Sequence, residues 1–259
     1  MCILAFQWNP DAATPLLVLA NRDEFYARPT ARLAWWDGNQ ILAGRDLQAG
    51  GTWLGLSRSG RFAALTNHRD PAANRPEAPS RGQLTVGFLQ SQGSARSCLE
   101  SLRSSAGHYN PFNLLLYDGA ELLGYESRQD RILSFSPGLH AVSNGVFDEP
   151  WPKVEALVAG LGTSPLDDEA LLALLADVRP AEEPRLPNTG VSLDWERALS
   201  PIFIRTPTYG TRASTLVRLG REQVTILEQG FGPGGPEGRA AFTFRQGSGD
   251  LQLLPNPRV

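Results

Sequence analysis

The sequence has few of the residues on which several common kinds of chemistry depend. Its 259 residues include one lysine, Lys153, three histidines and two cysteines, Cys2 and Cys98. Schiff-base chemistry therefore has a single candidate, and Lys153 is expected on a surface helix, which argues against that role. The histidines, at positions 68, 108 and 140, lack cysteines or carboxylates at metal-ligand spacing, so neither a zinc site nor another cofactor is expected.

Long apolar runs and charge clusters are also absent. No stretch of 18 apolar residues exists, so no membrane span is expected. No basic segment precedes Arg22 and no cleavage site follows, so no secretory signal is predicted. A cytoplasmic, reducing location is therefore expected, without a disulfide between Cys2 and Cys98. With a net charge of −3 and no cluster of basic residues, nucleic acid is not an expected partner.

The pattern of apolar residues and turn signals predicts strands at both ends of the chain, with helices between them. Helical spacing covers 80–90, 94–104, 152–161 and 167–178. Strands are predicted at 2–8, 15–20, 52–56, 61–66, 112–117, 121–127, 131–135, 140–143, 202–205, 212–219, 224–228 and 240–244. Residues 21–51 are expected to be irregular, and the glycine-rich stretch 232–238 to form a loop. This order favours a single α+β layered domain over 1–259 rather than alternating βαβ units.

Cys2 is informative because of its position. Methionine aminopeptidases remove Met1 when the next residue is small, and the mature chain would then begin with a cysteine. Its α-amine has an ordinary pKa near ~8 and its thiol near ~8.5. The amine can therefore act as the base for the thiol of the same residue. The alternative is that Cys2 is a small apolar residue at the start of a strand.

Four polar residues, Asn21-Arg22-Asp23-Glu24, directly follow the strand predicted to pair with the one that begins at Cys2. An arginine there would lower the pKa of the thiol, and a carboxylate would hold the amine. A solvated turn is the alternative interpretation of the same four residues.

Several longer motifs resemble those of the NRDE family, the family of the transport and Golgi organisation protein 2. The resemblance extends in order from residue 2 to the last strands. It rests on Cys2, the Asn-Arg-Asp-Glu-Phe-Tyr-Ala-Arg-Pro run at 21–29, Gly-Gly-Thr-Trp-Leu-Gly at 50–55, Ala-Ala-Leu-Thr-Asn at 63–67, Ser143-Asn144, Pro150-Trp151 and Tyr-Gly-Thr-Arg at 209–212. Members of that family have been connected with Golgi organisation, haem movement and the handling of lipids or acyl-CoA, without a settled activity.

More distantly, the family resembles the N-terminal-nucleophile amidases of the cholylglycine hydrolase, penicillin V acylase and acid ceramidase group. That resemblance implies a four-layer αββα sandwich. It also implies that Cys2 is the nucleophile, Arg22 the partner of the thiolate and Asp23 the holder of the amine. The oxyanion donors would be Asn67 and Asn144, and a late arginine of the site would be Arg212.

The sequence departs from the amidase pattern in two places. Arg22 and Asp23 are adjacent, whereas two residues separate their counterparts, so either Asp23 or Glu24 could hold the amine. Arg212 fits the late arginine only with a small shift, and Arg218 competes for that position. For the two asparagines, a loop-capping role is the alternative.

Two functions remain open from the sequence. One is an N-terminal cysteine amidohydrolase or acyltransferase that acts on a linear C–N amide of a small molecule. The other is a non-catalytic protein that holds a hydrophobic ligand, haem or an acyl-CoA, in the same cleft, with Cys2 as an iron ligand in the case of haem. The tryptophans at positions 35, 36 and 53 would form an apolar pocket wall or belong to the core.

Overall fold

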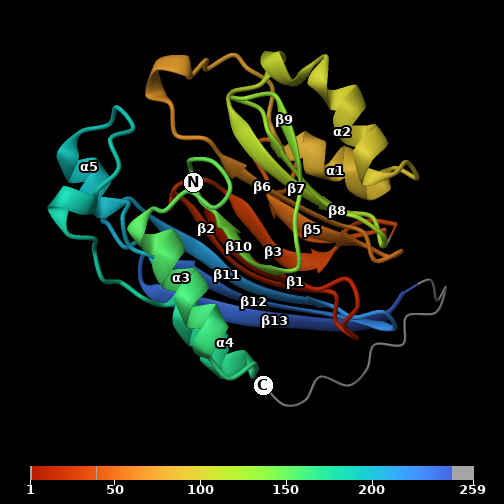
Figure 1. Ribbon diagram of the computed structural model, residues 1–259. Helices are drawn as coiled ribbons and strands as arrows, with labels where there is room; N and C mark the ends of the chain where they lie inside the picture. Colours follow the sequence, from red (N-terminus) through yellow and green to blue (C-terminus); the bar gives the residue numbers. More distant parts are fainter. Residues whose placement is uncertain (1, 39, 247–259) are drawn as a thin grey trace.

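The computed structural model describes residues 2–38 and 40–246, which form two antiparallel sheets packed face to face (Figure 1). The six-stranded sheet has the order β10-β1-β2-β11-β12-β13, with β1 Cys2–Trp8, β2 Leu16–Phe25, β10 Gly138–Val142, β11 Tyr209–Leu219, β12 Gln223–Gly232 and β13 Gly235–Arg245. The seven-stranded sheet runs in chain order from β3 to β9, with β3 Thr30–Trp35, β4 Ile41–Asp46, β5 Leu54–Ser57, β6 Phe62–Asn67, β7 Phe112–Tyr117, β8 Leu122–Glu126 and β9 Arg131–Ser134.

Helices cover the outer face of each sheet. Helices α1 Gly82–Gln90 and α2 Ala95–Arg103 pack on the seven-stranded sheet, whereas α3 Pro152–Thr163 and α4 Asp168–Leu175 pack on the six-stranded sheet (Figure 1). The short helix α5 Leu193–Ala198 lies beyond α4 in the chain. Across residues 2–38 and 40–246, no helix is both long and apolar enough to cross a membrane. The predicted α+β architecture with four αββα layers is therefore confirmed.

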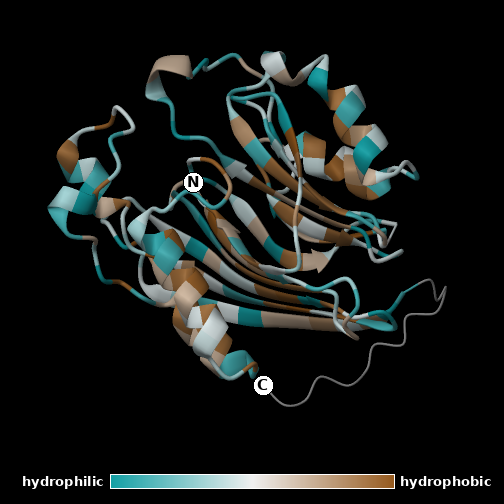
Figure 2. Ribbon diagram, viewed as in Figure 1, coloured by the Kyte–Doolittle hydropathy of each residue, from teal (hydrophilic) through white to brown (hydrophobic). Residues whose placement is uncertain are grey.

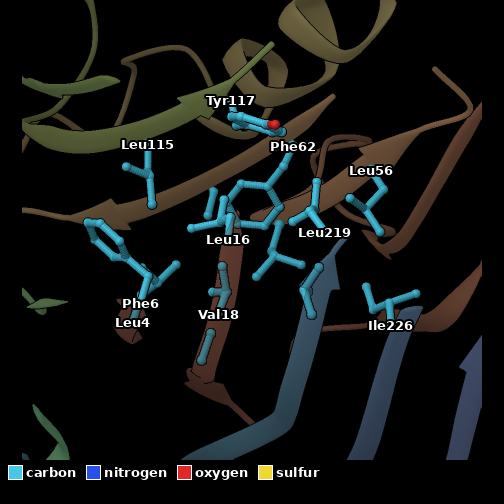
Figure 3. Packing of buried hydrophobic residues seen from close by; sticks show 14 of the residues in the cluster. Leu4, Phe6, Leu16, Val18, Leu56, Phe62, Leu115, Tyr117, Leu219 and Ile226 are labelled. Atoms are coloured by element: carbon cyan, nitrogen blue, oxygen red, sulfur yellow. The ribbon is translucent and has the colours of Figure 1, made fainter. Parts of the chain in front are cut away.

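Most of β1 and the first half of β2 are buried on both faces, which explains their nearly continuous apolar sequences. Leu4 and Phe6 point into the core between the sheets, which also holds Leu115 and Phe62 of the other sheet (Figure 3). Their neighbours Ile3 and Ala5 point the other way and pack under α3 and α4. The apolar residues accordingly gather on the facing surfaces of the layers (Figure 2).

Most of the predicted elements are present. The strands predicted between 52 and 66 and between 112 and 135 are confirmed, and the helices predicted at 94–104 and 167–178 begin at the N-caps Ser94 and Asp167. The prediction that residues 21–51 are irregular is wrong, because β2 continues to Phe25 and both β3 and β4 lie in that range. Pairing with β1 on one side and β11 on the other carries β2 beyond its apolar segment.

Three further differences lie in the second half of the chain. Residues 202–205 form no strand apart from one isolated bridge at Arg205. The stretch 232–238 is mostly strand, since β12 ends at Gly232 and β13 begins at Gly235. Helix α5 was not predicted, because its six residues are too few for a periodic pattern.

The start of α1 is held against the segment before β5 by a close backbone approach. A Cβ on Gly51 would lie 2.5 Å from the carbonyl carbon of Gly82, so a side chain does not fit there. The backbone N–H of Thr52 donates to the Gly82 carbonyl at 3.3 Å, and the Thr85 hydroxyl donates to the Thr52 carbonyl. The Gly-Gly-Thr-Trp motif therefore fixes where α1 begins.

We predict opposite effects for two glycine-to-alanine substitutions near α1. Gly51→Ala should lower the free energy of unfolding by about 1–3 kcal/mol, because the new methyl group displaces the first turn of α1. Gly87→Ala, in the same helix, should raise it by about 0.5–1 kcal/mol, because a methyl group there would meet no neighbouring atom within 4 Å. Urea unfolding measures both, and a Gly51→Ala variant as stable as the wild type would contradict the close approach.

Candidate active site

A cavity of about 430 Å³ opens where strands of both sheets meet the start of α1. It takes its lining from the ends of β2 and β11, from β4 and the segment after it, and from the residues that lead into α1. Five of the six site residues expected from the sequence contribute to that lining, namely Cys2, Arg22, Asp23, Asn67 and Arg212. Asn144 is fully buried behind it and does not line it.

The thiol of Cys2 and the guanidinium of Arg22 lie on the same face of the six-stranded sheet. The two residues are paired across the β1–β2 ladder, and their register places both on the side of Leu4 and Phe6, which faces the other sheet. Arg22 Nη1 donates to the Thr30 hydroxyl at 3.3 Å. The predicted proximity of Arg22 to the thiol is therefore present.

Burial raises the pKa of the Cys2 thiol above its ordinary value. The positive charge of Arg22 and a hydrogen bond from the backbone N–H of Asp23 act in the opposite direction but do not cancel the effect of burial. The thiol is therefore largely protonated at neutral pH, and it needs a base before it can act as a nucleophile.

Asp23 points to the opposite face of the sheet from Arg22, as adjacent residues in a strand do. Its Oδ1 accepts a hydrogen bond of 2.7 Å from the Thr211 hydroxyl. Burial raises the pKa of the Asp23 carboxyl, while the positive charge of Lys153 acts to lower it. Because Arg22 and Asp23 are adjacent, their side chains lie on opposite faces of the six-stranded sheet. The Arg22 guanidinium is on the same face as the Cys2 thiol, and the buried Asp23 carboxyl is on the helix-covered face.

Glu24 lines the cavity but has different surroundings from Asp23. Its Oε1 accepts from the Phe25 backbone N–H at 2.8 Å, and its Oε2 lies 3.9 Å from Arg28 Nε. Its side chain is partly exposed. Asp23, in contrast, is buried with the positive charges of Lys153 and Arg69 acting on it, and which of the two carboxylates would hold an N-terminal amine stays a prediction.

The expectation that Lys153 lies on the protein surface is wrong. It is the second residue of α3, its exposed fraction is 4%, and its Nζ donates to the Leu199 carbonyl at 3.0 Å. Burial, together with the charge of Arg69, lowers the pKa of Lys153 to about 8. The sequence did hold a signal, because Lys153 precedes Leu157 and Leu161 at the four-residue spacing of the buried helix face.

A buried ion pair lies beside these residues and was also missed. Arg69 Nη1 lies 2.6 Å from Glu196 Oε2, and both side chains are almost fully buried. Glu196 Oε1 in turn accepts from the backbone N–H and the hydroxyl of Thr189. The short helix α5 supplies Glu196 and so completes a group of buried charged residues that also contains Asp23, Lys153 and Arg69. No pattern in the sequence indicated that Arg69 would pair with Glu196.

Asn144 connects Asn67 to the strand that begins with the nucleophile candidate. Its Nδ2 donates to the Asn67 carbonyl at 2.8 Å, and the neighbouring Ser143 hydroxyl donates to the Cys2 carbonyl at 3.0 Å. These contacts fix the backbone of Asn67 at the cavity. The roles of both asparagines as oxyanion donors stay predictions.

Arg212 lies at the cavity because β11 has a bulge at that residue. In the pairing of β11 with β2, Thr211 lies opposite Asp23 and Ala213 lies opposite Arg22. Arg212 is therefore the extra residue of the bulge. Its Nη1 donates to the carbonyls of Phe25, Tyr26 and Arg28, each at 3.2 Å. The competing Arg218 pairs with Asp168 of α4 and does not line the cavity.

The remaining candidates have different places. Trp53 lines the cavity, whereas Trp35 packs against the core between the sheets and Trp36 against the core under α1 and α2. His68 lies with Nδ1 3.3 Å from the Gly145 carbonyl. Cys98 is half-buried, and both cysteines are free, as expected from the sequence.

Comparison with known proteins identifies the family to which this chain belongs. A family profile described as Transport and Golgi organisation 2 matches residues 1–233. The chain belongs to this family. The bovine transport and Golgi organization protein 2 homolog is 35% identical over 260 residues, covering 88% of the chain and 92% of the bovine protein. The human homolog is 32% identical over 256 residues, with the same two coverages. The Drosophila melanogaster protein is 28% identical over 260 residues, covering 86% of the chain and 89% of the fly protein.

Solved structures with a similar arrangement are distant in sequence. A Caenorhabditis elegans ortholog of N-acylethanolamine-hydrolyzing acid amidase has a TM-score of 0.48 and 10% identity, and the match covers 83% of this chain and 92% of that one. A variant of conjugated bile acid hydrolase from Clostridium perfringens has a TM-score of 0.42 and 11% identity, with coverages of 87% and 88%.

Lys153 gives a prediction for the dependence of stability on pH. Its pKa is about 8 in the folded protein and has an ordinary value of 10.5. Between these values the unfolded chain binds more protons than the folded one, so Lys153 adds stability as the pH rises. The unfolding free energy of the wild type minus that of Lys153→Met should therefore increase by on the order of 3 kcal/mol between neutral pH and pH above 10.

Urea unfolding of both proteins across this range measures the difference. No other lysine titrates and every tyrosine is common to both proteins, so the difference reports on Lys153 together with the buried Asp23 and Cys2 whose charges interact with it. A difference that stays constant with pH would mean that Lys153 is solvated in solution.

Proposed function

We propose that the protein is an N-terminal cysteine amidohydrolase or acyltransferase that acts on a linear amide, with Cys2 as its nucleophile after removal of Met1. The observation that carries this proposal is the position of the thiol at a cavity wall, paired with Arg22 across the ladder and hydrogen-bonded by the Asp23 backbone N–H. A cation beside the sulfur stabilises a thiolate, which a cysteine that serves only as a small apolar residue never forms.

The identity of the base supports the same conclusion. A buried thiol with a raised pKa needs a proton acceptor, and in the described part of the chain no histidine lines the cavity. Removal of Met1 supplies an acceptor in the α-amine of Cys2 itself, covalently held next to the thiol. Asp23, beneath Cys2 on the helix side of the sheet, orients this amine.

The reaction then proceeds in two steps. The amine takes the thiol proton, the sulfur attacks the amide carbonyl, and the oxyanion that forms receives a hydrogen bond from Asn67, which Asn144 holds at the cavity from behind. Collapse breaks the C–N bond, and the amine returns its proton to the leaving nitrogen, which leaves a thioester on Cys2. Water, or another acceptor for acyl transfer, attacks the thioester and releases the acid or the new acyl product.

The alternative, a carrier for haem or another hydrophobic ligand, receives less support from the chemistry of the cavity. Six arginines and five carboxylate residues line it, and Trp53 and Leu65 are its main large apolar residues. A pocket built to hold an apolar ligand is lined mainly by apolar and aromatic side chains.

We expect purified protein to begin at Cys2 in an intact-mass measurement and to form a covalent acyl adduct with substrates from a panel of acyl amides. Cys2→Ala should abolish both the adduct and hydrolysis. The matched control is Cys98→Ala, because Cys98 lies in α2 away from the cavity and its loss should leave both unchanged. A retained Met1 together with a thiol that resists iodoacetamide at position 2 would refute the proposal.

The two carboxylates after Arg22 are expected to behave differently. Asp23→Asn keeps the hydrogen bond with Thr211 but removes the charge that orients the amine, so it should slow hydrolysis by on the order of 10²-fold. Glu24→Gln removes only a partly exposed ion pair and should change the rate by about fivefold or less. The ratio of kcat/KM for the two variants decides which carboxylate holds the amine, and a larger loss for Glu24→Gln would reverse the assignment.

A further inference from the structure

We propose that the cavity recognises an anionic group of its ligand, a carboxylate or a phosphate, through Arg81 at the start of α1. This inference rests on the proposed function only in that Cys2 is taken as the reacting residue of the same cavity.

Several guanidinium groups line the cavity, and the carboxylates beside them do not form ion pairs with all of them. Asp46 accepts from Arg28 at 2.7 Å and lies 3.9 Å from Arg22 Nη2, so one carboxylate serves two arginines. Glu228 accepts from the Leu33 backbone N–H at 2.9 Å, and burial raises the pKa of its carboxyl, which favours its neutral form. These carboxylates therefore leave part of the positive charge of the wall uncompensated.

Three of the lining arginines bond to backbone carbonyls rather than to carboxylates among residues 2–38 and 40–246. Arg81 Nη1 donates to the Pro111 carbonyl at 2.9 Å, and Arg45 Nε to the Gly50 carbonyl at 3.3 Å. The third is Arg212, whose carbonyl contacts hold the end of β2. A carbonyl orients a guanidinium without neutralising it, so these side chains keep their full charge at the cavity.

Arg81 lines the same cavity as Cys2, and the charge of its guanidinium interacts with the thiol. Burial lowers the pKa of the Arg81 guanidinium. The negative charges of the Cys2 thiolate and the Glu24 carboxylate act in the opposite direction and raise it. Arg22 approaches the same thiol from the six-stranded sheet, whereas Arg81 approaches from the helix layer of the other sheet. A ligand group bonded to Arg81 would therefore sit next to the carbonyl that Cys2 attacks.

The backbone around Arg81 favours an anion at the same place. Arg81 is the N-cap of α1, its side chain makes no capping bond, and the first turn of this nine-residue helix contains no acidic residue. Ser80, Arg81 and Gly82 all line the cavity, so the positive end of the helix dipole faces it. The close packing of Gly51 on Gly82 fixes this helix end in position. Side chain and helix end thus act together on one spot.

The test compares two alkylating reagents of similar size, neutral iodoacetamide and anionic iodoacetate, on Cys2 of the full-length protein. The ratio of their rate constants does not depend on the fraction of thiolate, since both reagents attack the same thiolate. In Arg81→Gln the iodoacetate-to-iodoacetamide ratio should fall by about 10-fold relative to the wild type, because one positive charge near the sulfur is lost.

Two further variants separate charge from structure. Arg81→Lys keeps the charge and should restore most of the ratio. Arg218→Gln removes an arginine on the α4 side of the molecule, outside the cavity, and should leave the ratio unchanged. An unchanged ratio in Arg81→Gln, or an equal fall in Arg218→Gln, would overturn the inference. The assay needs no turnover, so failure to hydrolyse any amide would count against the proposed function alone.

Protection of Cys2 from iodoacetamide then distinguishes the two kinds of anion. Inorganic phosphate and succinate are the probes, each measured with the wild type and with Arg81→Gln. Protection by phosphate alone indicates a phosphate group, and protection by succinate indicates a carboxylate. Protection that persists equally in Arg81→Gln, or none by either probe, contradicts recognition at Arg81.

Discussion

Strands β1 and β2 pair residue for residue from their hairpin to the pair of Cys2 and Arg22, and the rest of the site depends on that register. The register is strongly fixed, because both faces of this part of the sheet are buried and a slip by one residue would exchange them. One face carries Leu4 and Phe6 into the core between the sheets, and the same alternation carries Cys2 and Arg22 to the cavity. The packing of the core thus sets the position of the thiol.

The other face of β2 explains why buried charges are tolerated beside an apolar core. Asp23 lies among Lys153, Arg69 and Thr211, and Arg69 pairs with Glu196 from α5. An isolated buried carboxylate would be protonated, but opposite charges and a hydrogen bond counter the cost of burial. The protein therefore keeps a charged layer between the six-stranded sheet and its helices, directly beneath the residue that becomes the N-terminus when Met1 is removed.

The cavity combines two kinds of arginine with different tasks. Arg212 is held by the carbonyls of the residues that follow β2, so it stabilises the shape of the wall. Arg22, paired with Cys2 across the β1–β2 ladder, and Arg81, at the start of α1, line the same cavity from different layers, so the proposed anion would meet positive charge from both. A chain with a net charge of −3 thus gathers cations at one site, which concentrates anionic ligands there.

The sequence by itself determined the layered architecture, because continuous apolar runs at 2–8 and 15–20 and the capped helices are local patterns. It also indicated Cys2, Arg22, Asp23, Asn67 and Arg212 through motifs that belong to the family, and these residues meet at one cavity. Only the tertiary structure decided that Lys153 is buried, that Arg69 pairs with Glu196 and that Arg81 approaches the thiol. Those contacts join residues distant in the chain, and no local spacing encodes which distant partner a charged side chain will meet.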